Sequence, residues 1–162
     1  MPGFNSTTTP ITGDQVGAFP DGLNSPGVVS LDGSTTISKG MHKDRILTLD
    51  GAGAEYTQTL PDASGSGDVY NFIVGAVNTS NHIITTQTAD ALYGTIYANA
   101  TGDTPDLGQP WPAGAGDTMT FNGTTTGGQA IGDKVQVIDM AKNKWMVIGF
   151  TTSSGAEATP FS

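Results

Sequence analysis

The chain contains no cysteine and few of the residues that favour helices, and both shortages narrow the possible folds. Without cysteine there can be no disulfide framework and no metal site built from thiolates. Leucine occurs seven times, glutamate twice and arginine once, whereas threonine occurs 24 times and glycine 23 times. Residues that form strands and turns therefore dominate, and the composition predicts an all-β fold.

Positive charge is also scarce, because six Lys and Arg residues stand against 15 Asp and Glu residues and leave a net charge of −9. Binding to nucleic acid needs clustered Lys and Arg that neutralise phosphates, so we expect no nucleic-acid partner. No apolar run approaches the roughly 20 residues of a membrane-spanning helix, and the first ten residues do not read as a signal peptide. We therefore expect a soluble chain with no membrane partner.

The patterning divides the chain into three segments. Residues 1–27 combine Gly, Pro, Thr, Asn and Ser with widely spaced apolar residues in no regular period, so we interpret them as an extended N-terminal arm. Residues 28–150 carry the strand signals and form the expected β-sandwich domain, and residues 151–162 form a polar C-terminal tail. Hydrophobic residues make up only 36% of the chain, and such a thin core often depends on a partner subunit for part of its burial.

Within the domain, short apolar runs recur at the spacing typical of β-sandwiches, and we expect a jelly-roll-like sandwich or barrel of about 8 to 10 strands. Asn122 and Gly123 form a dipeptide typical of a type I′ hairpin turn, and 140–143 should be a short loop between two apolar strands. Residues 99–116 contain three prolines and are expected to form a long loop outside any sheet. The expected strands are 28–31, 35–38, 45–50, 56–60, 69–76, 82–87, 93–98, 118–122, 134–139 and 144–150.

Two motifs carry a resemblance to a known family. The run TLP-x-ASGSG-x-VY-x-F-x-VG begins at Thr59, and the turn NGTTTGG begins at Asn122. Over roughly residues 45–162, the sequence resembles the small head decoration (capsid cement) proteins of tailed bacteriophages. The resemblance implies a β-rich subunit, commonly trimeric, on the outer surface of an icosahedral virion shell, which it reinforces without catalysis. The implied partners are further copies of the chain, as a homotrimer, and the major capsid protein.

The N-terminal arm is one candidate contact with a partner. Its composition gives it no means of folding alone, so its apolar residues should be anchored on another surface. We favour an arm laid on a neighbouring subunit or on a capsid protein, and the alternative is an arm packed against its own domain. The candidate anchors are Phe4, Ile11, Val16, Phe19 and Leu23.

The basic residues form a second candidate contact, because all six fall in two clusters. Between Arg45 and Lys134 lie 88 residues with nine acids and no positive charge. If the clusters meet in the fold, they could dock on an acidic partner, including the next subunit of an oligomer. The alternative, which we favour, is that these are solvated turns with lysines that flank adhesive strands. The clusters are Lys39, Lys43 and Arg45, with His42 among them, and Lys134, Lys142 and Lys144.

A carbohydrate-binding module is the second functional class to consider. Trp111 lies between two prolines, and Tyr93 and Tyr97 share one strand face, so the three rings could stack on sugars. A tryptophan in this setting more often fixes a loop to a sheet or anchors a subunit interface. A decoration protein therefore remains the preferred hypothesis, with a lectin-like module as the alternative.

An enzyme is the weakest of the three classes. The sequence has no G-x-S-x-G motif and no glycine loop that leads into a helix to bind phosphate. His42 and His82 are 40 residues apart and have no cysteine nearby, so we predict no zinc site. Asp103 and Asp106 could pair as catalytic acids or bind Ca²⁺, but aspartates at such positions usually cap turns. We expect no catalytic residue, no metal and no cofactor.

Overall fold

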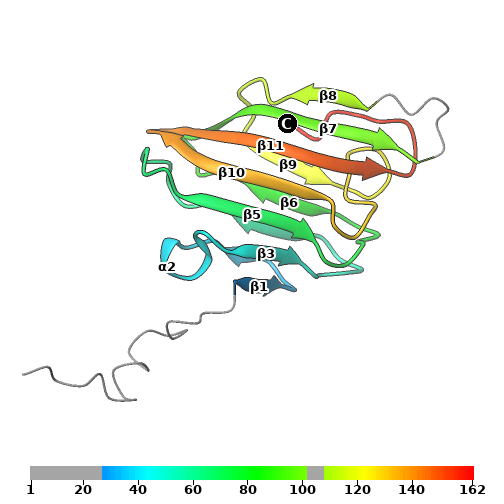
Figure 1. Ribbon diagram of the computed structural model, residues 1–162, viewed down its shortest axis with the longest axis horizontal. Helices are drawn as coiled ribbons and strands as arrows, with labels where there is room; N and C mark the ends of the chain where they lie inside the picture. Colours follow the sequence, from blue (N-terminus) through cyan, green and yellow to red (C-terminus); the bar gives the residue numbers. More distant parts are fainter. Residues whose placement is uncertain (1–26, 102–107) are drawn as a thin grey trace, which may run out of the picture.

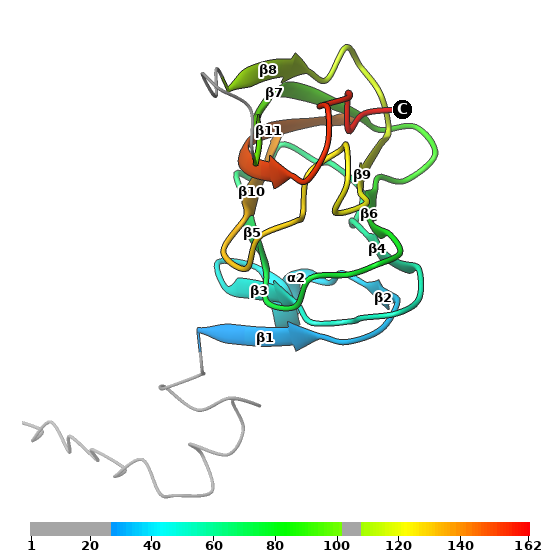
Figure 2. The same ribbon diagram turned by 90° about the vertical axis from the view of Figure 1, so that its right-hand side faces the viewer.

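The computed structural model describes residues 27–101 and 108–162, which form two β-sheets packed face to face (Figures 1 and 2). The all-β prediction is confirmed, and all ten expected strands are present. The seven-stranded sheet, here called the large sheet, has the order β1 (Val28–Leu31), β3 (Ile46–Leu49), β5 (Val69–Val74), β10 (Lys134–Ala141), β11 (Lys144–Ser153), β7 (Ala91–Ala100) and β8 (Gln109–Pro112). The four-stranded sheet, the small sheet, has the order β2 (Thr35–Thr36), β4 (Tyr56–Thr59), β6 (His82–Thr85) and β9 (Thr118–Phe121). A short helix, α2 (Lys39–His42), connects β2 to β3.

The first six strands wind between the two sheets. Strands β1, β3 and β5 are parallel neighbours in the large sheet, and β2, β4 and β6 are parallel neighbours in the small sheet. Parallel neighbours need a crossover connection, and here the passage to the opposite sheet and back provides it. Strand β10 is antiparallel to β5 and β11 in the large sheet, and β9 is antiparallel to β6 in the small sheet. Both sheets are therefore mixed, and a jelly-roll connectivity is not confirmed.

The core lies between the sheets, because alternate side chains of each strand point inward. The large sheet contributes Trp145 from β11 and Tyr70 from β5, and both side chains are fully buried. Their rings meet edge to face with centroids 5.8 Å apart. The small sheet contributes Ile84, Met119 and Phe121. The other large, fully buried side chains are Phe72, Ile37, Leu47, Leu49, Leu60, Leu92, Ile96 and His82.

One expected loop is partly a strand. The prediction that 99–116 lies outside any sheet is wrong, because β7 continues through Ala100 and residues 109–112 form β8. Strand β8 pairs only with β7 and is the edge of the large sheet. An edge strand tolerates prolines because one side of its backbone donates no ladder hydrogen bond, which is why Pro110 and Pro112 do not prevent pairing.

The turn at Asn122 also differs from its prediction. A type I′ turn needs positive φ at both central residues, but only Gly123, with φ of 70°, has it. The side-chain oxygen of Asn122 instead accepts hydrogen bonds from the amides of Thr124, Thr125 and Thr126, which holds an open loop in place of a hairpin. The hairpin between β10 and β11 is confirmed, because Ala141 pairs with Lys144.

The C-terminal residues are part of the sandwich. Strand β11 extends to Ser153, beyond the expected boundary at residue 150. The last residues run antiparallel to β9, where Phe161 bridges to Met119 and the carbonyl oxygen of Ser162 accepts hydrogen bonds from the amides of Asp117 and Thr118. The tail therefore covers the outer edge of the small sheet, which would otherwise expose unpaired backbone groups.

The buried His82 predicts a pH dependence of folding. Burial lowers its pKa below 6.5, although the carbonyl of Ala76 and the charge of Asp50 oppose the shift. The unfolded chain thus takes up this proton more readily than the folded chain, so stability is complete above about pH 6.5 and declines as the pH falls below it. We expect the free energy of unfolding in urea to decrease from about pH 7.5 to about pH 5, and His82→Gln to reduce that decrease. An equal decrease in the variant would contradict this role of His82.

Candidate functional site

One side of the large sheet, here called the outer face, faces away from the small sheet (Figure 1). Its exposed side chains are largely apolar. Six large hydrophobic side chains on it are between 39% and 54% exposed, and they are six of the ten that are exposed in the described part of the chain. They come from β1, β3, β7 and β11, which are not consecutive in sequence. These side chains are Val28, Ile46, Tyr93, Tyr97, Ile148 and Phe150.

The opposite surface of the molecule has a different chemistry. The outward positions of the small sheet are mostly threonines, with Ile83 as the apolar exception. Threonine suits a strand whose outer side faces water, because its branched side chain favours the strand and its hydroxyl stays solvated. The contrast between the two outer surfaces makes the outer face of the large sheet the candidate interaction surface.

Aromatic rings on the outer face are packed side by side. Tyr97 and Phe150 are register partners on β7 and β11, and their rings stack with centroids 5.7 Å apart. The Lys134 Nζ atom lies 6.0 Å from the Phe150 centroid, and the Lys144 Nζ atom lies 5.8 Å from the Tyr93 centroid. Neighbouring side chains therefore already occupy much of the ring faces. A sugar stacks on an open ring face, so this arrangement favours a protein contact.

A depression of about 310 Å³ lies in the outer face over β3, β5, β10 and β11. Its apolar walls come from Ile46, Ile73, Ile148 and Phe150, and Lys134 also lines it. Two polar side chains in it bind each other, because the Gln136 amide donates to Asn71 Oδ1 at 2.8 Å. The depression is thus a largely apolar socket with one positive charge.

The basic clusters meet only in part. Lys142 lies next to the first cluster, because its backbone bridges to Ser64, whose hydroxyl accepts a hydrogen bond from Lys39 at 3.1 Å. Lys134 is the first residue of the eight-residue strand β10, and Lys142 follows the last one. The length of the strand therefore separates Lys134 from Lys142 by about 23 Å. Lys134 and Lys144 are the charged side chains at outward positions of β5, β7, β10 and β11. Arg45 immediately precedes β3.

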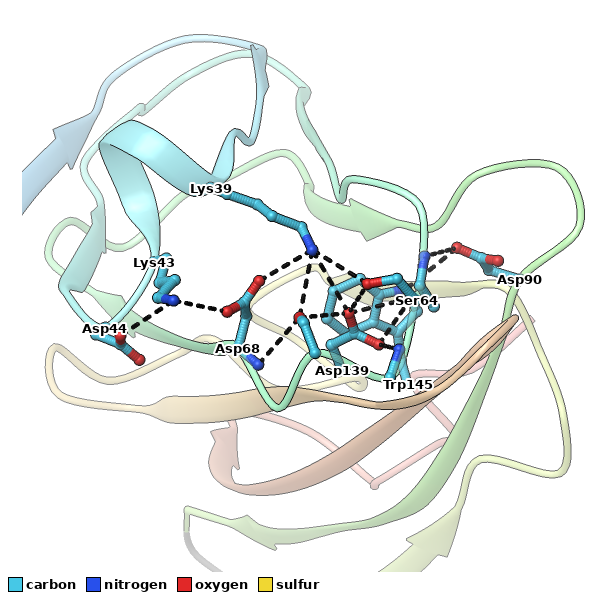
Figure 3. Close-up of polar contacts among 11 residues, drawn as sticks. Lys39, Lys43, Asp44, Ser64, Asp68, Asp90, Asp139 and Trp145 are labelled. Carbon is cyan, nitrogen blue, oxygen red and sulfur yellow. Dashed lines mark hydrogen bonds and ion pairs between the residues drawn. The ribbon is translucent and has the colours of Figure 1, made fainter.

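Lys39 and Lys43 form ion pairs with the buried carboxylate of Asp68 (Figure 3). The two Nζ atoms lie 3.1 Å and 2.9 Å from the carboxylate oxygens of Asp68. Hydrogen bonding from Ser66, then from Lys43, lowers the pKa of Asp68 to about 2 against the opposing effect of burial, and Lys39 adds to the lowering. Asp68 therefore stabilises the fold above about pH 4, and this contribution is lost as the pH falls toward 2.

Asp139 is the centre of this polar cluster, because it holds the loop between β4 and β5. Its oxygens accept hydrogen bonds from the amides of Ser64 and Gly65, at 2.9 Å and 2.6 Å, and from the hydroxyls of Ser64 and Ser66. Burial alone would raise its pKa, but these hydrogen bonds outweigh burial and hold the pKa well below its usual range. Gly65 has φ of 80° and lies against the backbone of Ala141, so a side chain there would be strained.

Two more buried carboxylates have the same role. Asp133 accepts hydrogen bonds from the amides of Gly128, Ala130 and Thr152. Asp90 accepts from the amide of Ala63 at 2.7 Å. The donors around these acids are backbone amides and side chains of the fold itself, so the carboxylates are committed to structure.

Other residues that the sequence singled out are not assembled into a site. Trp111, the candidate sugar-stacking aromatic, is partly buried, because it is the register partner of the inward-facing Ile96 and its indole nitrogen is buried. His42 is in α2 and His82 in β6, and the described residues contain no group of three or more His, Cys, Asp or Glu that could hold a metal ion. Asp103, Asp106 and the five arm anchors lie outside the described residues.

Sequence reasoning missed the outer face, although a signal for it was present. From Trp145 to Phe150 every residue except Gly149 has a large apolar side chain, so both sides of the strand are apolar. Such a run is typical of a strand that is covered on both sides. Trp145 and Val147 point into the core. Met146, Ile148 and Phe150 alternate with them and therefore lie on the outer face.

Comparisons of the chain with protein-family models, with curated proteins and with solved structures find no match. In the ranges 27–101 and 108–162, no helix is long and apolar enough to cross a membrane. Function must therefore be inferred from the chemistry of the chain's own surface.

The polar cluster predicts a large effect of Asp139→Asn. An amide in place of the carboxylate removes the charge and points an NH₂ group at donors, so we expect a loss of about 3 kcal/mol, the contribution of one or two hydrogen bonds to a charged group. Urea denaturation at neutral pH measures it. The exposed Asp62→Asn, in the same loop region, is the matched control and should change stability little. A similar small effect for both variants would show that Asp139 does not hold the loop.

Proposed function

We propose that this chain is a structural virion protein that decorates an icosahedral phage capsid as a homotrimer and stabilises it by non-catalytic binding across several shell subunits. The observation that carries the proposal is the outer face, an apolar surface of six exposed large side chains opposite a threonine-lined surface. The resemblance of residues 45–162 to head decoration proteins supports the same function.

The chemistry of the outer face suits a flat protein partner. A shell subunit that presents apolar side chains can cover Ile46, Ile148 and the aromatic pair Tyr97 and Phe150, and it excludes water from them. Lys134 lies in the depression at the end of β10, where an acidic group of the partner would meet it. Charged groups at such a position guide the encounter and select the partner more than they add affinity.

The stabilising effect would come from linkage between contacts. A trimer at a junction of shell subunits presents three outer faces, and after the first has bound, each further contact forms at high effective concentration. Separation of two shell subunits then requires several contacts to break together. No reacting group is needed for this function, which agrees with the structural use of Asp139, Asp133 and Asp90.

The oligomer is the first part of the proposal to test. The core is thin and the resemblance implies a trimer, so we expect the 16.5 kDa chain to associate into trimers that leave the outer face open. Sedimentation equilibrium at micromolar concentration measures the mass directly. A monomer under these conditions would rule out the trimer.

The docking surface is tested by paired substitutions. Ile148→Asp places a charge in the centre of the outer face, whereas Ile83→Asp places it on the outward side of the small sheet. We expect Ile148→Asp to weaken co-sedimentation with undecorated phage shells at least roughly tenfold, the effect of about 1.4 kcal/mol per contact, and Ile83→Asp to leave it nearly unchanged. Unfolding curves for both variants check that folding is intact. Equal binding by the two variants would place the docking surface elsewhere.

A further inference from the structure

The outer face has no cover in the described part of the chain, and the residues that precede it in sequence are suited to provide one. The arm ends where β1 begins, and β1 is the edge strand of the large sheet. The chain therefore enters the domain at one border of the outer face. A cover that starts at this border needs no long connection.

The arm is long enough to reach the depression. Leu23 precedes Val28 by five residues and Phe19 precedes it by nine, so extended chain can carry them about 16 Å and about 30 Å from the start of β1. The depression covers β3 to β11, which are about 5 to 19 Å from β1 at the usual strand spacing. Both side chains can thus reach the apolar walls of the depression.

The charges of the two surfaces are complementary. Asp14 and Asp21 are the charged side chains of residues 1–26, and both are negative. Lys134 lines the depression and makes no ion pair with any residue that the structure describes. Asp21 lies between Phe19 and Leu23 in the sequence Phe-Pro-Asp-Gly-Leu, which is typical of a turn. A turn there would present the two apolar side chains and the carboxylate together.

We infer that, in the free protein, the N-terminal arm covers the outer face of its own large sheet, with Phe19 and Leu23 in the depression and Asp21 beside Lys134. The arm is tethered at Val28, so it meets its own outer face at an effective concentration of about millimolar. The contact does not require a shell. The further idea that a shell displaces the arm rests on the proposed function. If the chain fails to bind shells, the contact between the arm and the outer face can still be tested by itself.

The contact is tested on the full-length chain without any shell. The sequence has no cysteine, so Asn24→Cys accepts a spin label at one defined position next to Leu23. We expect the label to broaden the methyl NMR signals of Ile46, Ile73 and Ile148, which line the depression, and to leave that of Ile83 on the opposite surface unchanged. Equal signals for all four methyls with the label oxidised or reduced would overturn the inference.

A mixed sample distinguishes the chain's own arm from that of a neighbour. One chain carries the spin label but no NMR isotopes, and the other carries isotope-labelled methyl groups but no spin label. The two chains are mixed and allowed to exchange subunits. We expect no broadening in this mixture. Broadening in this mixture would show that the arm of one chain covers the outer face of a second copy. That result would overturn the inference that the arm covers its own sheet.

Charge exchange tests the pairing of Asp21 with Lys134. We expect Lys134→Glu and Asp21→Lys each to reduce the population of the covered state roughly two- to five-fold, the range of a partly exposed ion pair. The double variant should restore it. Lys142→Glu makes the same charge change at the β10–β11 turn, away from the depression, and should leave the broadening as in the parent. Broadening that is the same in all these variants would overturn the pairing.

Discussion

The structure depends on buried carboxylates that hold glycine-rich connections against the sandwich. Asp139 is the clearest case, because it accepts the amides of Ser64 and Gly65 from a loop about 75 residues away in sequence. Glycine-rich chain loses much conformational entropy when it is ordered, and a hydrogen bond to a charged acceptor is roughly twice as strong as one to a neutral acceptor. A buried carboxylate without donors would be costly, but these acids are saturated with donors and therefore fix the loops. Asp90 accepts the amide of Ala63 in the same loop, and Asp133 accepts the amide of Gly128 in the connection between β9 and β10.

Once the connections are fixed, the winding of β1 to β6 determines which surfaces are covered. Each sheet covers the inner side of the other, and both outer sides remain open. The sequence treats these open sides differently, with threonines such as Thr57 and Thr120 on one and residues such as Ile148 and Phe150 on the other. Strand propensity alone would accept either choice on both sides. The difference therefore has another origin than strand propensity, and it makes the outer side of the large sheet the candidate contact surface.

Much of the fold was predictable from local sequence, and the site was not. Alternation of apolar residues located ten strands, because burial of one strand side leaves a period of two in the sequence itself. Strand β8 was missed because Pro110 is unfavourable in a strand unless that strand is an edge, and edge position is a property of the whole sheet. The parallel strand pairs and the hydrogen bond from the Gly65 amide to Asp139 join segments that are distant in sequence. Such contacts leave no pattern in the local sequence. The outer face is likewise assembled from strands that are not consecutive, although the run after Trp145 indicated cover on both sides.

The magnitude of the outer-face interaction explains why linkage matters. Each of its six large side chains is about half exposed, so complete burial would contribute about 1 kcal/mol apiece, or about 6 kcal/mol together. Association of two free molecules costs at least about 4 kcal/mol in lost translational and rotational freedom, which leaves one isolated contact weak. A tethered arm avoids most of that cost, and so do the second and third contacts of a bound trimer. Under the proposed function, a surface that binds one free partner only weakly would therefore rely on tethering or on linked contacts for its net affinity.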